Sequence, residues 1–115
     1  MNRGDIYLVD LESVVGSEAN KKRPAVLVTN NAANRMAGRA GRGVLAVVPV
    51  TSNVSRVWPF QVLLHAADCG LRTDSKAQCE QIRALDLSRF GHRIGVVPPH
   101  VLKEIDRALR QQLAL

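Results

Sequence analysis

The pattern of apolar positions in the first half of the chain predicts short, buried strands. Residues 6–11, 25–28 and 44–50 are strand-length runs dominated by β-branched and other apolar side chains. The last two runs are apolar at every position, which is typical of central strands that are buried on both faces. Pro24 is expected to begin the second strand, because a residue without an N–H group is tolerated at the first position of a strand.

Polar stretches separate these strands. Residues 12–20 are expected to form a long loop of the kind that often carries binding residues. Residues 30–36 contain three asparagines and are expected to form at most one helical turn. Residues 38–43 read Gly-Arg-Ala-Gly-Arg-Gly and are expected to form a flexible basic turn. This glycine spacing is not a nucleotide cradle, because no helix is expected to follow it.

The second half predicts shorter strands and then a helix. Strands are expected over residues 58–64, 75–82 and 93–96, with a turn at 68–70 and one helical turn over 86–90 that Asp86 caps. From Pro99 onward apolar residues recur at helical spacing, at positions 101, 102, 105, 108, 109 and 113. The expected fold class is mainly β with a C-terminal helix: a small, strongly bent barrel of antiparallel strands that forms a single domain over residues 1–115.

The net charge of +6 is distributed unevenly along the chain. No acidic residue lies between Glu18 and Asp68, and this basic segment carries seven cations. The rest of the chain holds 16 − 7 = 9 cations and 10 acids, a balance of −1. A field concentrated in this way attracts a polyanion, of which nucleic acid is the commonest. A basic surface that only keeps the protein soluble is the alternative.

The sequence also predicts a cytoplasmic protein. The apolar runs are only strand-sized, so no membrane span is expected, and no apolar stretch that would mark a signal peptide follows the N-terminus. Cys69 and Cys79 have neither CxxC nor metal-ligand spacing, so we expect small core residues rather than a disulfide.

Two polar groups are expected at the ends of the buried strands. Arg23 directly precedes the second strand, and Thr51 directly follows the apolar run of the third. A guanidinium held at a rigid strand end is a planar, permanently charged fork that suits phosphate. The alternative for the three cations at 21–23 is a solvated basic turn, and spacing alone does not decide between the two.

The remaining chemistry favours a reaction that needs no metal and no cofactor. No His or Cys stands at zinc spacing, and the basic segment contains no carboxylates for a metal-dependent nuclease. His65, His92 and His100 are scattered over a strand end, a loop and a helix start. RNA, however, carries its own nucleophile, the 2′-hydroxyl. Cleaving RNA therefore requires alignment of that hydroxyl and stabilisation of the charge that develops on the phosphorus centre, which a clamped arginine and a strand-end hydroxyl can supply.

Five segments resemble, in the same order, the MazF/PemK toxins of bacterial toxin–antitoxin modules: residues 3–7, 16–18, 22–26, 50–53 and 80–86. The resemblance runs nearly end to end and includes the C-terminal helix. It implies an SH3-like barrel, a homodimer, and a ribosome-independent, metal-independent endoribonuclease that inhibits translation and growth. It also implies cleavage of single-stranded RNA at short sequences, with a 2′,3′-cyclic phosphate and a 5′-hydroxyl as products.

The same resemblance places the catalytic arginine at Arg23 and the catalytic threonine at Thr51. The positions expected to bind RNA surround these two: Glu18, Asn20, Lys22, Asn30, Ser52, Asn53, Trp58 and Gln81. Trp58 is included because aromatic faces stack on unpaired bases. Asn30 is expected either to bind base edges or to cap the turn, and Phe60 to belong to the core or a dimer interface. Some relatives assign catalysis to an Arg-x-Asp-Gln motif, which reads Gln-Cys-Glu-Gln here, so Glu80 is a secondary candidate only.

Two other functions are consistent with the predicted barrel. A CcdB-like toxin poisons DNA gyrase without RNase activity, but that class lacks the Arg-Pro and Thr-Ser motifs. A non-catalytic barrel that binds nucleic acid would use the basic segment alone. The implied partners are a single-stranded RNA substrate and a cognate antitoxin, whose acidic, disordered tail suits a basic groove.

Overall fold

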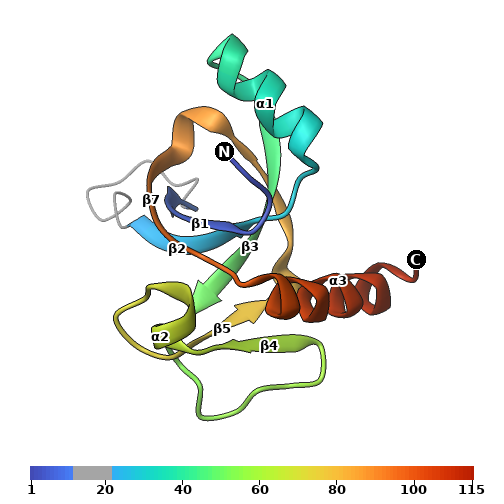
Figure 1. Cartoon of the computed structure of the whole chain (residues 1–115). Coiled ribbons are helices and arrows are strands. Elements are labelled where there is room, and N and C mark those ends of the chain that lie inside the picture. Colours follow the sequence, from blue (N-terminus) through green and yellow to red (C-terminus); the bar gives the residue numbers. More distant parts are fainter. Residues whose placement is uncertain (12–21) are drawn as a thin grey trace.

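A computed structural model describes residues 1–11 and 22–115, and within them seven strands form one antiparallel sheet. The strands are β1 (Asp5–Asp10), β2 (Lys22–Leu27), β3 (Val44–Thr51), β4 (Gln61–Leu64), β5 (Ser75–Gln78), β6 (Arg83–Asp86) and β7 (Phe90–Val96). The helices are α1 (Asn31–Ala40), α2 (Ala66–Cys69) and α3 (Pro99–Leu113), with 3₁₀ turns at Cys79–Gln81 and Leu87–Arg89. The predicted fold class, mainly β with a C-terminal helix, is confirmed (Figure 1).

The sheet curls because β3 changes partners along its length. The strand order in the sheet is β4-β5-β3-β2-β1-β7, and β6 also pairs with β3, outside this order. β6 pairs with the first half of β3, from Val44 to Val47, whereas β5 pairs with its end, at Val50 and Thr51. Pro49 lies between these two pairings. The sheet therefore bends at the point where β3 leaves one neighbour and joins the other.

Both faces of the central strands are buried, as the continuous apolar runs predict. Val26 and Val48 belong to a larger hydrophobic cluster, while Ala25, Leu27 and Val47 belong to a smaller one on the opposite face. α3 closes the larger cluster and supplies four of its fifteen buried residues, which are Val101, Ile105, Ala108 and Leu109. The predicted amphipathic helix and its packing on the sheet are thus confirmed.

Arg3 joins the start of the chain to its last helix. Its Nε donates to the carbonyl of Val28, directly after β2 (2.8 Å), and its Nη2 forms an ion pair with Asp106 of α3 (2.6 Å). Its backbone N–H donates to the Asn31 side chain in α1 (2.7 Å). One residue therefore connects the N-terminal segment, β2, α1 and α3.

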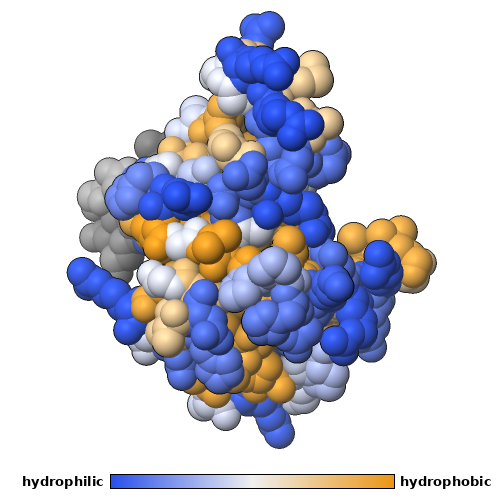
Figure 2. All heavy atoms as spheres, viewed as in Figure 1, coloured by the Kyte–Doolittle hydropathy of each residue, from blue (hydrophilic) through white to orange (hydrophobic). Residues whose placement is uncertain are grey.

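The prediction of at most one helical turn over residues 30–36 is wrong, because α1 runs for ten residues. Asn30 is its N-cap, and its side chain accepts from the Ala33 N–H; Gly41 ends the helix in the left-handed conformation (φ 69°). The flexible basic turn expected over 38–43 is wrong for the same reason, since its first three residues complete α1. The helix stands away from the sheet (Figure 1), and mostly hydrophilic residues cover it, in contrast to the apolar C-terminal end of the chain (Figure 2).

The strand predicted over residues 75–82 is also wrong in length. β5 ends at Gln78, a 3₁₀ turn follows, and the chain then forms β6 beside the first half of β3. β7 begins at Phe90 instead of residue 93, so His92 lies on a strand and not in a loop. The helical turn after Asp86 is confirmed, with the Asp86 carboxylate accepting from the Ser88 N–H (2.9 Å). In the described part of the chain, no helix combines the length and the apolar character needed to cross a membrane.

Candidate active site

A cavity of about 680 Å³ brings the two predicted catalytic residues together. The register of β2 and β3 explains why: Ala25 pairs with Pro49, Arg23 lies two positions before Ala25 on β2, and Thr51 lies two positions after Pro49 on β3. In an antiparallel pair the start of one strand meets the end of the next. Arg23 and Thr51 therefore lie across from each other at one edge of the sheet, and both line the cavity, together with Ser52.

Segments from five parts of the chain form the walls of this pocket. The described residues that line it are Leu8, Arg23, Pro24, Val50, Thr51, Ser52, Gly70, Leu71, Arg72, Thr73, Ser75, His92, Arg93 and Ile94. They come from β1, the start of β2, the end of β3, the segment that leads into β5, and β7. Aliphatic side chains alternate with cations and hydroxyls, a composition that suits a ligand with both apolar and anionic parts.

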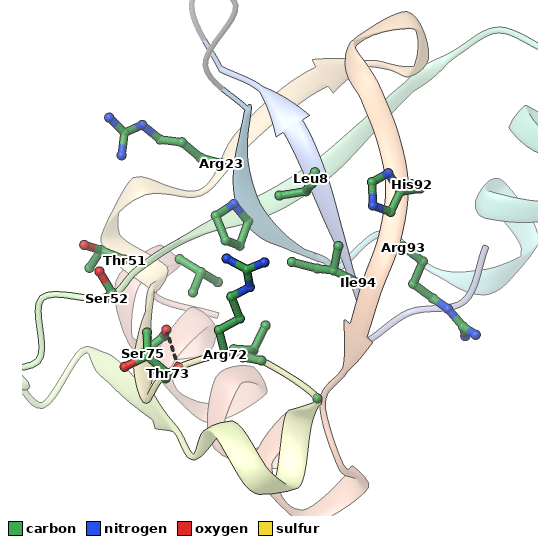
Figure 3. A pocket seen from close by; sticks show the side chains of 14 residues that line it. Leu8, Arg23, Thr51, Ser52, Arg72, Thr73, Ser75, His92, Arg93 and Ile94 are labelled. Carbon is green, nitrogen blue, oxygen red and sulfur yellow. Dashed lines mark hydrogen bonds between the residues drawn. The ribbon is translucent and has the colours of Figure 1, made fainter.

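The two catalytic candidates differ in how they are held. Arg23 is exposed, and its side chain extends outward from the start of β2 at the edge of the pocket (Figure 3). Thr51 is half-buried, and its Oγ1 accepts a long hydrogen bond from the Asn53 N–H (3.3 Å). Asn53 in turn accepts from the Ser55 hydroxyl (2.8 Å). The Thr51 oxygen thus has a fixed acceptor role towards the following turn, while its own proton remains available to a ligand.

The structure adds to the pocket a cation, Arg72, that the sequence did not reveal. Arg72 rises from the segment before β5, and its guanidinium ends in the middle of the pocket (Figure 3). His92 and Arg93 come from β7, but the Arg93 side chain points away and forms an ion pair with Asp5 (3.6 Å). No sequence signal marks Arg72, because it lies outside the basic segment and reaches the pocket only through the folding of residues 70–75 over the sheet.

Several residues predicted to bind RNA lie outside the lining of this pocket. Lys22 is exposed beside Arg23 on β2, and Gln81 is exposed on the 3₁₀ turn after β5. Asn30 caps α1, as one of its two alternatives predicts, and its contact with RNA stays a prediction. Asn53 belongs to the turn after Thr51. Glu18 and Asn20, like the rest of the predicted loop, lie outside the described residues.

Trp58 belongs to a separate stacked group. Its ring lies parallel to that of Phe60 (centroids 6.1 Å apart, 6° between planes), and the Arg56 guanidinium lies 4.3 Å from the indole centroid. Trp58 is 43% exposed, so part of the ring faces solvent. Arg56, Trp58 and Phe60 belong to the connection between β3 and β4. The buried Lys76 holds this connection in place by donating from Nζ to the Arg56 carbonyl (2.6 Å).

Glu80 contacts the same connection and does not line the pocket. Its Oε2 accepts from the Gln61 side-chain amide (2.9 Å), and the side-chain oxygen of Gln61 accepts from the backbone N–H of Trp58 (3.1 Å). The Glu80 Oε1 is buried without a hydrogen-bond partner among the described residues. In this arrangement Glu80 positions the chain before β4.

Both cysteines are free and buried, as predicted. Burial, and secondarily the Glu80 carboxylate, raises the pKa of the Cys79 thiol to about 11, and burial likewise raises the pKa of Cys69. A thiol with a raised pKa is a poor nucleophile at neutral pH. Among residues 1–11 and 22–115, no group of three or more His, Cys, Asp or Glu side chains is arranged to hold a metal ion.

Comparison with protein families decides the assignment. The model of the PemK-like, MazF-like toxins of type II toxin–antitoxin systems matches residues 2–113. The chain belongs to this family. It is 53% identical, over all of its length and 98% of the relative's, to "Endoribonuclease MazF9" of Mycobacterium tuberculosis. It is 33% identical to "Endoribonuclease EndoA" of Bacillus subtilis, again over its whole length and 96% of that protein.

Solved structures give the same result. A mycobacterial endoribonuclease superimposes with a TM-score of 0.78 at 26% identity, covering all of this chain and 92% of the other. A mycobacterial endoribonuclease in complex with its cognate antitoxin matches with a TM-score of 0.78 at 25% identity, covering 100% and 96% of the two chains. By these comparisons this MazF-like chain is an endoribonuclease toxin of a toxin–antitoxin module. The assignment favours the endoribonuclease over the gyrase poison and the non-catalytic barrel.

Proposed function

We propose that this MazF-like toxin cleaves single-stranded RNA at short sequences, independently of ribosomes and without a metal ion, and thereby arrests translation and growth. The observation that carries the proposal is the convergence of Arg23 and Thr51 on one cationic pocket. Arg23, Arg72 and His92 surround a space large enough for part of an RNA strand, and RNA supplies the nucleophile itself.

In the proposed reaction, the ribose 2′-oxygen attacks the adjacent phosphorus and the bond from phosphorus to the 5′-oxygen breaks. The 2′-hydroxyl loses its proton and the leaving 5′-oxygen gains one, so the products are a 2′,3′-cyclic phosphate and a 5′-hydroxyl. The Arg23 guanidinium stabilises the extra negative charge on the phosphorane, and the Thr51 hydroxyl donates a hydrogen bond to a phosphoryl oxygen. Because a guanidinium stays protonated in proteins, Arg23 is a poor general base, and charge stabilisation is its main role.

Cleavage of a long defined transcript in the presence of EDTA tests this function. We expect 5′-hydroxyl and cyclic-phosphate ends, and we expect Arg23→Ala and Thr51→Ala to lower kcat about 10²–10³-fold, as the loss of one transition-state donor does elsewhere. Thr51→Ser keeps the hydroxyl and should restore most of the activity. Arg35→Ala removes an equal charge from exposed α1 and serves as the control. A requirement for a divalent ion, or full activity of both alanine variants, would contradict the proposal.

We also propose that the toxin forms a homodimer and that a cognate antitoxin inhibits it with an acidic, disordered tail. The solved complex of a mycobacterial endoribonuclease with its antitoxin supports this partner class. The arginines at the pocket provide the complementary charge. Light scattering should give twice the chain mass of 12.6 kDa, and adding the antitoxin should abolish cleavage. A monomer at micromolar concentration would contradict the first part.

A further inference from the structure

The pocket holds more positive charge than one scissile phosphate uses. Arg23 lies at its outer edge, whereas the Arg72 guanidinium reaches its middle from the opposite wall (Figure 3). A single guanidinium already binds a phosphate in bidentate fashion. A cavity of about 680 Å³ lies within the range of ~300–1,000 Å³ that holds a drug-sized ligand, so it accommodates more than one phosphate group.

Among the described residues, the Arg72 guanidinium has no hydrogen-bond or ion-pair partner. Within the described residues it forms no salt bridge, although Arg93 on the neighbouring wall pairs with Asp5. The nearest acid along the chain, Asp74, accepts instead from the Ala66 N–H at the start of α2 (2.8 Å). An arginine that points into a pocket with its donors free, beside aliphatic walls that lower the local dielectric, is a site for an anion.

We propose that Arg72 binds the RNA phosphate adjacent to the scissile one, so that the pocket holds two successive phosphates. Arg23 and Thr51 engage the reacting phosphate, and Arg72 fixes the neighbouring phosphate, which sets the register of the strand. The aliphatic side chains of Leu8, Leu71 and Ile94 contact the sugar or base between the two phosphates. This inference rests on the proposed function, and it adds a binding site to that function.

Binding to a non-cleavable oligonucleotide tests the site. The wild-type cut position is first mapped on a long transcript, and an RNA spanning that position is synthesised with a 2′-deoxy group at the scissile nucleotide. Fluorescence anisotropy then gives Kd as a function of salt for the wild type, Arg72→Ala, Arg72→Lys and Arg107→Ala. Arg107 is exposed on α3, away from the pocket, and controls for the loss of one charge.

For Arg72→Ala we expect Kd to rise about tenfold, since the variant loses a charged hydrogen-bond donor to phosphate at a partly solvated site. The slope of log K against log salt should fall by ~0.7, the value for one phosphate contact on a single strand. Arg72→Lys keeps the charge, so it should keep the slope while losing part of the affinity. Arg107→Ala should match the wild type.

Methylphosphonate substitution, which removes the charge of one linkage at a time, locates the contact. In the wild type, two successive linkages should weaken binding; in Arg72→Ala only the scissile linkage should still do so. An unchanged Kd and salt slope for folded Arg72→Ala, or a wild-type profile with one sensitive linkage, would overturn the proposal. These results are distinct from a failure of the proposed function, which would show as an uncut transcript in EDTA. Weaker binding of an acidic peptide with unchanged RNA binding would assign Arg72 to a protein partner and would also overturn it.

Discussion

The packing of Gly95 against α2 gives a prediction whose sign and size follow from the structure. A Cβ atom added at Gly95 would lie closer than 3.0 Å to the carbonyl oxygen of Cys69, a backbone atom that no side-chain rotation can move. Gly95→Ala therefore forces β7 and α2 apart. Overpacking of this kind costs about 1–3 kcal/mol, and we expect the upper end because both partners are backbone. At about 4 °C per kcal/mol for a domain of this size, the Tm should fall by roughly 10 °C.

Two other glycines provide matched controls for the same chemical change. At Gly91 the added atom would meet the Leu8 carbonyl oxygen at 2.9 Å, so a smaller loss is expected. At Gly38 in α1 nothing lies within 4 Å of the added atom. Gly38→Ala should raise stability by about 0.5–1 kcal/mol, because glycine is unfavourable inside a helix.

Thermal and urea denaturation, followed by circular dichroism, measure the series. All variants are compared at one protein concentration, because the Tm of a dimer depends on it. The expected order of Tm is Gly38→Ala, wild type, Gly91→Ala and then Gly95→Ala. A Gly95→Ala protein that melts within 2 °C of the wild type, or a Gly38→Ala protein that is the least stable, would refute the packing argument.

Three further predictions concern capping, the connection before β4, and a buried thiol. Asn30→Ala removes the N-cap of α1 and should lower the free energy of unfolding by ~1 kcal/mol in urea titrations, whereas Asn30→Asp should retain most of it. Lys76→Met leaves the Arg56 carbonyl without its donor, so backbone amides near Trp58 should exchange faster with deuterium; unchanged exchange would contradict that role. Cys79 keeps its proton to about pH 11 in the folded protein but loses it near 9.0 when unfolded, so the free energy of unfolding should fall between pH 9 and about 11. The free energy of unfolding should fall less over this pH range in Cys79→Ala than in the wild type. An equal fall in both proteins would contradict the raised pKa of Cys79 as its cause.

The central strands were predictable because strands that are buried on both faces have apolar residues at consecutive positions. β2 and β3 are apolar on both faces, and the two hydrophobic clusters take alternate residues from each. The same local logic placed Thr51 at the end of β3 and Arg23 beside the start of β2, although β2 begins at Lys22 and not at Pro24 as predicted. Antiparallel pairing then brought the two residues together. The two residues lie close together because β2 and β3 are consecutive strands that pair directly with each other.

Features that depend on distant partners were missed. In α1 only Asn34 and Ala37 are buried, so the helix shows no apolar stripe, and only its caps at Asn30 and Gly41 mark its bounds. The break between β5 and β6 follows from the change of partner along β3, which no local pattern reveals. Arg72 reaches the pocket through the same kind of non-local folding.

The link from Arg3 to Asp106, together with the four α3 residues in the larger cluster, has a consequence for synthesis of the toxin. During translation the N-terminal strands leave the ribosome long before their final packing partner exists. The larger cluster stays open to water until residues 101–109 have emerged and can cover it. An RNA-cutting enzyme built in this order completes its fold only after residues 101–109 have been translated, so each active molecule comes from a message that was still uncut as far as the codons for these residues.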